Sequence, residues 1–160
     1  MTTKAEFNAQ EWSQITEGPA LAGLIVIASQ RGGTIRESLA MASVYKEAQK
    51  THGAGDLVGE LVQSAPDLNA NQFSSKEDMH DRGLEQIRDA VALVEAKVTP
   101  EELEEYRTFA MAVAQHAAEA DKSGGFLGVG GERISGNEQS ALNEIAEALG
   151  TELPPASPAS

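Results

Sequence analysis

Apolar residues recur at spacings of three and four along most of the chain. The clearest stripes run over 84–98 and 103–117, and a shorter one runs over 142–149. This spacing puts apolar side chains on one face of a helix, so it predicts amphipathic α-helices. The stripes consist of Leu84, Ile87, Val91, Val94 and Val98; Leu103, Tyr106, Ala110, Val113 and Ala117; and Leu142, Ile145 and Leu149.

The segment 20–28, ALAGLIVIA, is apolar on all sides, which predicts a helix buried at the centre of the fold. It has about half the length that a membrane span requires, so no transmembrane segment is expected. No stretch alternates apolar and polar residues for long enough to predict a strand. The expected class is therefore all-α. Helices are predicted near 8–16, 19–30, 35–51, 56–64, 76–97, 100–122 and 136–149.

Capping boxes mark several of the predicted helix starts. In this motif a Ser or Thr precedes a Glu by three residues, and each side chain accepts a hydrogen bond from a free backbone N–H. Pro100 strengthens one start, because proline suits the first helical position, and Gly150 predicts a C-terminal cap. The boxes are Thr34–Glu37, Ser74–Glu77, Thr99–Glu102 and Ser135–Glu138.

The chain of 160 residues has the length of one domain. We expect residues 1–150 to form a single domain of about seven helices, packed as an orthogonal bundle. The end, TELPPASPAS, is rich in Pro, Ala and Ser and has no apolar period. Residues 151–160 are therefore predicted to be a disordered tail.

The formal charge of −13 argues against nucleic acid or an anionic membrane surface as a partner. Residues 65–150 hold seven basic and seventeen acidic side chains, a net charge of −10. Such a surface is either simply solvated, a cation site, or a docking face for a basic protein partner. The absence of cysteine excludes disulfides and thiolate chemistry, and the polar N-terminus does not resemble a signal peptide. A cytoplasmic location is expected, and a homo-oligomer stays open.

The glycine-rich segment 123–136 is the least ordinary stretch of the sequence. Its glycines fit neither a dinucleotide fingerprint nor a P-loop, because Gly131 and Glu132 stand where the P-loop has Lys and Ser or Thr. We expect a loop that folds back onto the core, with a partner or ligand lid as the alternative. The candidate contact residues are Phe126, Leu127, Gly128, Gly130 and Gly131.

Histidines and nucleophiles give no catalytic motif. Glu77-x-x-His80 has the spacing of one half of a di-iron site, but Val113 stands three residues before His116, where a second Glu would be needed. His52 has no such partner either, and we expect all three histidines at the surface or its boundary. No serine lies in a nucleophile elbow. The sequence therefore predicts no enzyme; a small metalloenzyme would require a transition metal on His80 or His116.

The segment ERISGNEQSALNEIAEALG, 132–150, resembles the helix that recurs in TerB-like tellurite resistance proteins. The segment 24–42 resembles a degraded first copy of the same unit, with Gly-Gly before a capping box. The resemblance implies two divergent helix–turn–helix halves. The matching residues are Ile134, Glu138, Leu142, Ile145, Ala146, Leu149 and Gly150.

The resemblance also implies a cation site of acidic residues at the glycine-rich segment: Asp121, Glu132 and Glu138. Carboxylates of this kind suit Ca²⁺, Mg²⁺ or Mn²⁺, here with weak affinity. The chain departs from the family pattern, since the first copy has Gly32-Gly33 without an Asp and the second carries an insertion after Asp121. The favoured function is an acidic, non-enzymatic binding module of the stress response. The alternative is an accessory or scaffold subunit that docks a protein through its acidic helices, without metal.

Overall fold

The structure is a computed structural model that describes residues 4–29, 46, 49–50, 57–63, 73–123 and 136–151. Within these residues the chain is all-helical, as expected, and none of the helices is both long and apolar enough to cross a membrane. The elements are η1, a 3-10 helix (Lys4–Glu6), and five α-helices: α1 (Ala9–Ser29), α3 (Leu57–Gln63), α4 (Lys76–Lys97), α5 (Pro100–Ser123) and α6 (Gly136–Leu149).

The expectation of about seven helices is wrong for the described residues, which form five. The helices expected at 8–16 and 19–30 are one continuous helix, α1, with Pro19 inside it. The helix expected at 35–51 lies almost wholly outside the described residues; the described positions 46, 49 and 50 are helical. The other four helices begin and end within one residue of the predicted bounds.

Pro19 is accommodated inside α1 because another helix replaces the hydrogen bond that it cannot make. Proline has no N–H, so it offers no donor to the carbonyl of Ile15, four residues earlier. The hydroxyl of Tyr106 in α5 donates to that carbonyl oxygen at 2.8 Å. Gly18 leaves room for the hydroxyl, since a β-carbon at this position would lie 2.3 Å from Tyr106 Oη.

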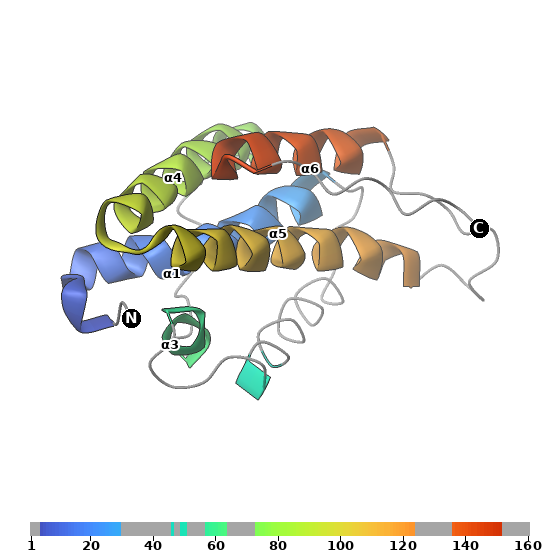
Figure 1. The fold of residues 1–160 in the computed structure, drawn as a ribbon. Helices are drawn as coiled ribbons and strands as arrows, with labels where there is room; N and C mark the ends of the chain where they lie inside the picture. Colours follow the sequence, from blue (N-terminus) through green and yellow to red (C-terminus); the bar gives the residue numbers. More distant parts are fainter. Residues whose placement is uncertain are drawn as a thin grey trace.

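Helix α1 is the central element of the bundle. It packs most extensively against α4 and α5, and it also contacts α3 and α6. Helices α4 and α5 are joined by Val98 and Thr99 and diverge from that corner (Figure 1). Helix α6 packs against α1, α4 and α5 together, and α3 lies on the opposite side of α5 (Figure 1).

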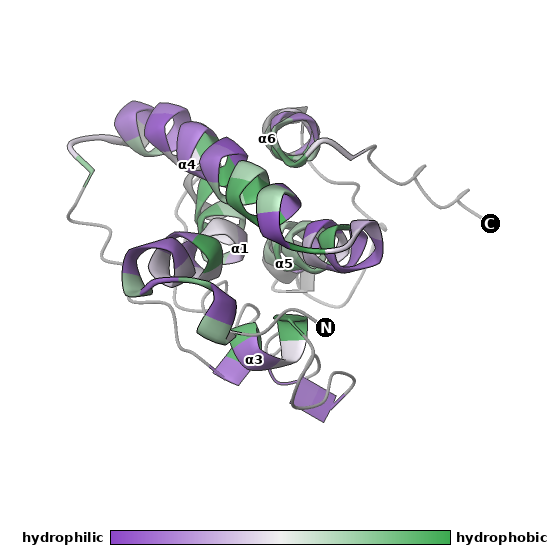
Figure 2. Ribbon diagram, turned by 60° about the vertical axis from the view of Figure 1, so that its left-hand side comes forward, coloured by the Kyte–Doolittle hydropathy of each residue, from purple (hydrophilic) through white to green (hydrophobic). Residues whose placement is uncertain are grey.

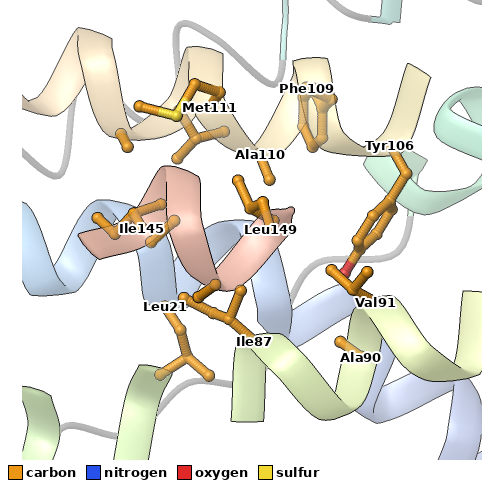
Figure 3. Close-up of a cluster of buried hydrophobic side chains, with 14 of the residues drawn as sticks. Leu21, Ile87, Ala90, Val91, Tyr106, Phe109, Ala110, Met111, Ile145 and Leu149 are labelled. Atoms are coloured by element: carbon orange, nitrogen blue, oxygen red, sulfur yellow. The ribbon is translucent and has the colours of Figure 1, made fainter. Parts of the chain in front are cut away.

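The predicted apolar stripes form the core. Every stripe residue is buried except Val98, which is partly buried. Side chains from α1, α4, α5 and α6 meet in one cluster that includes Leu21, Ile87 and Ile145 (Figure 3). The outer side of α4 is hydrophilic while its inner side is hydrophobic (Figure 2). The packing thus follows the pattern that the sequence predicts.

The start of α5 confirms one predicted capping box. The Thr99 N–H donates to Glu102 Oε2 at 3.1 Å, and the Glu102 N–H donates to Thr99 Oγ1 at 3.2 Å. The box predicted at Ser74 is displaced by one residue: Ser75 is the N-cap of α4 and accepts from the Asp78 N–H, while the Ser74 N–H donates to Asp78.

Caps are also described at α1 and α6, whereas the boxes predicted at Thr34–Glu37 and Ser135–Glu138 lie outside the described side chains. Asn8 and Glu11 form a reciprocal box at α1, with bonds of 2.9 and 2.8 Å. The box was not predicted, because Asn rather than Ser or Thr stands at the cap position. At α6, Gly150 has φ +76° and bonds to Glu147 O, and the Thr151 N–H bonds to Ala146 O. These two bonds form a Schellman motif, so the predicted C-terminal cap is confirmed.

Candidate functional site

The predicted site at the glycine-rich segment lies almost entirely beyond the described residues. Asp121 lies in the last turn of α5 and Glu138 in the first turn of α6, and their side chains are not among those described. The others lie outside the described residues: Phe126, Leu127, Gly128, Gly130, Gly131 and Glu132.

The helices on either side of this segment run in opposite directions. Arg107, near the start of α5, donates from Nε to the carbonyl oxygen of Leu149, at the end of α6, at 2.8 Å. The end of α5 and the start of α6 therefore lie at the same end of the molecule (Figure 1). The backbone positions of Asp121 and Glu138 are thus brought to that end.

The best-defined polar cluster in the described residues joins α4 to α6. The His80 Nδ1 atom contacts Asp81 Oδ1 at 2.9 Å, and its Nε2 atom contacts Glu144 Oε2. His80 and Glu144 are partly exposed, at 39% and 41% of their side-chain surface, and Asp81 is exposed. Each ring nitrogen thus faces one carboxylate, on two different helices.

The surroundings of His80 favour its charged form. The hydrogen bond with Asp81 raises the pKa of His80 most strongly; burial opposes the shift, and the contact with Glu144 adds to it. An imidazolium held between two carboxylates is a poor general base, because both ring nitrogens carry a proton that is already donated. The arrangement therefore suits a charge-dependent contact between helices rather than acid–base catalysis.

The described histidines lie at the surface or its boundary, as expected. Glu77 is exposed in α4, one turn before His80, which is partly exposed. His116 is exposed, as expected, and its Nδ1 atom contacts the carbonyl oxygen of Ala112 at 2.9 Å. His52 lies outside the described residues. Within the described part of the chain, no three His, Asp or Glu side chains are arranged to hold a metal ion.

A second polar cluster ties the end of α4 to the N-terminal segment. Lys97 Nζ bonds to Glu11 Oε2 at 2.8 Å and to the carbonyl oxygen of Glu6 at 3.1 Å, and it lies 5.2 Å from the centre of the Phe7 ring. The hydrogen bond from Lys97 and that from the Asn8 backbone lower the pKa of Glu11. These contacts are all internal, so the cluster has a structural role.

Acidic side chains also form a row along the exposed side of α4. They recur every four residues, at Glu77, Asp81, Glu85 and Asp89, and all four are exposed. Helix α4 also carries two arginines: Arg82 pairs with Asp78 at 3.2 Å and lies over the Phe73 ring, and Arg88 is exposed. We call this row the α4 acidic row.

Comparisons with known proteins identify no relative of this chain. No protein-family model matches the chain, and neither the curated proteins nor the solved structures contain a match. The candidate sites therefore stand on the residues and their geometry.

The sequence analysis missed Asp81 and Glu144 as partners of His80. Asp81 is adjacent in sequence, but adjacency alone does not orient two helical side chains toward each other. Glu144 is 64 residues from His80, so no local pattern pairs the two.

Proposed function

We propose that this chain is a non-enzymatic, acidic helical binding module of the TerB-like type, acting in the stress response. Its site would be the glycine-rich segment 123–136, as a weak divalent-cation or partner site. The observation that supports this is the antiparallel course of α5 and α6, which brings the helix ends bearing Asp121 and Glu138 to one end of the molecule.

The proposal assigns the cation to Asp121, Glu138 and Glu132, the last from the segment between the two helices. Hard carboxylate oxygens favour Ca²⁺, Mg²⁺ or Mn²⁺ over softer transition metals. The high acidity of residues 65–150 raises the local concentration of any cation. Under this proposal α5, the connecting segment and α6 form the second helix–turn–helix half, and residues 24–42 begin the first.

Native mass spectrometry with added Ca²⁺, Mg²⁺ or Mn²⁺ tests the site. We expect a bound ion and a matching rise in thermal stability, because a ligand that binds the folded state alone stabilises it. Both effects should disappear in Asp121→Asn and Glu138→Gln, whereas Glu95→Gln, an exposed acid of α4, should keep them. An apo mass with all three ions, or ion binding that survives both variants, would contradict the cation site.

The α4 acidic row supports the alternative, an accessory subunit that docks a basic protein without metal. Like charges four residues apart on a helix repel each other, so a basic partner seated on the row would relieve that repulsion. This alternative predicts salt-sensitive association with a basic partner that weakens in Glu85→Gln and Asp89→Asn. The same two variants should leave ion binding unchanged if the cation site is correct, so the two functions are separable.

A further inference from the structure

The contacts of His80 require a particular protonation state. A neutral imidazole has one N–H and one lone pair, whereas an ionised carboxylate can only accept hydrogen bonds. Both ring nitrogens of His80 face carboxylates, Asp81 through Nδ1 and Glu144 through Nε2. Both contacts are hydrogen bonds only when the ring is an imidazolium; in the neutral form one carboxylate faces a lone pair.

From this geometry we propose that His80, Asp81 and Glu144 form a pH-dependent latch, which holds α6 against α4 while His80 is protonated and loosens when His80 becomes neutral. The latch is a property of the described helices. It does not depend on cation binding at the glycine-rich segment.

Among the described side chains, the charged groups that contact His80 are acidic. Asp81 from α4 and Glu144 from α6 are the charged groups that act on it within the described residues. Glu77 and Glu147, one turn away on the two helices, are exposed acids, and Arg82 is engaged with Asp78. Residues 18–29 of α1, which packs against both α4 and α6, contain no titratable side chain, and the described side chains of α5 give His80 no charged contact.

The direction of the pH effect follows from the raised pKa of His80. Holding α6 in place favours the proton, so the latch is fully engaged below the ordinary histidine value of 6.5. As the pH rises through the raised pKa, the ring loses its proton and the stabilising contribution is lost. The latch therefore loosens from neutral toward mildly alkaline pH.

The two ends of α6 should respond differently. The last residue of the helix is held by Arg107, whose Nε donates to the Leu149 carbonyl, and arginine keeps its charge over this pH range. Glu144 lies just past the middle of the helix, five residues before Leu149. Loosening the latch should free the residues before Glu144 more than those after it, so α6 would open from its N-terminal half.

Amide hydrogen exchange on the full chain tests the latch. Protection factors, corrected for the intrinsic pH dependence of exchange, are measured across α6 from pH 6 to pH 9. We expect the protection factors of the amides of residues 139–145 to fall as the pH rises. The fall should be about tenfold for each pKa unit that separates His80 in the closed latch from His80 in the open one. The amides of 146–149 should lose less.

Matched variants identify the group responsible. His80→Gln and Glu144→Gln should remove the pH dependence, while His116→Gln, which alters an exposed histidine of α5, should keep it. A wild-type pH dependence in His80→Gln would overturn the proposal. If a variant fails to fold, an NMR titration of His80 in the wild-type chain decides: a pKa above 6.5 supports the latch, and an ordinary or lower value overturns it.

Discussion

Tyr106 stabilises α1 through a single hydroxyl group. The apolar stripe of α5 places the ring in the core, where it is fully buried. The hydroxyl then supplies the donor that Pro19 lacks, at 2.8 Å from Ile15 O. Burying a carbonyl without a partner costs stability, so this contact explains how a proline persists within a buried helix.

At this scale we predict that Tyr106→Phe destabilises the fold by about 1–3 kcal/mol, because the Ile15 carbonyl loses its donor. Urea denaturation of the purified variant measures the change. The ring itself is retained, so the loss reports on the hydroxyl rather than on the packing.

A second background separates the hydrogen bond from other effects of the substitution. Pro19→Ala restores an N–H four residues after Ile15, so Tyr106→Phe should cost less in that background than in the wild type. Equal losses in both backgrounds would show that the hydroxyl does not compensate for the proline.

Helix ends depend on contacts between residues three to five positions apart. Thr99 and Glu102 satisfy each other's free N–H groups, and the Gly150 cap closes α6 with bonds to Glu147 and Ala146. Such contacts are local, so the sequence predicts them well. The one-residue displacement at α4 arose because Ser74 and Ser75 are both suitable caps, and Asp78 as well as Glu77 can complete the box.

We predict at the element scale that Thr99→Ala destabilises the fold by about 1 kcal/mol, since the first turn of α5 loses its N-cap. Thr108→Ala is the matched control, because Thr108 is exposed within the same helix and alanine suits a helix interior. The pair is compared by thermal denaturation. A control that loses as much as Thr99→Ala would show that the cap contributes nothing.

At the scale of the whole molecule, the packing of the core depends on how closely the helices approach one another. Gly83 lies where α4 meets α1, and a β-carbon there would come within 3.0 Å of Ile25 Cδ1. The glycine therefore serves packing, although alanine would be the better helix former at this position.

At the scale of the whole molecule, we predict that Gly83→Ala changes the free energy of unfolding more favourably in an Ile25→Val background than in the wild type. The difference should be about 0.5–3 kcal/mol. Valine lacks the Cδ1 atom, so the added methyl group no longer meets it and the gain in helix propensity remains. Denaturation of the four proteins of this cycle measures the coupling. A coupling of zero would mean that the Ile25 side chain moves aside without cost.

At the candidate sites, the sequence indicated individual residues but not their partners on other helices. The sequence singled out His80 through its spacing from Glu77, but it gave no indication of the contact with Glu144. It named Asp121 and Glu138 from the resemblance, and the antiparallel course of α5 and α6 gives their helix ends a common location. Neither the His80–Glu144 contact nor that common location is encoded in a local pattern.

The sequence by itself determined what depends on neighbours along the chain. Periods of three and four residues determined the helices and their buried faces, and short-range motifs determined the start of α5 and the end of α6. Tertiary structure decided what depends on contacts between distant segments. The hydroxyl of Tyr106 supports one continuous helix where the sequence predicted two, and the packing of α6 against α4 gave His80 its second carboxylate. Periodicity states which face of a helix is buried, but it does not state which helix covers that face, and this is the physical reason for the division.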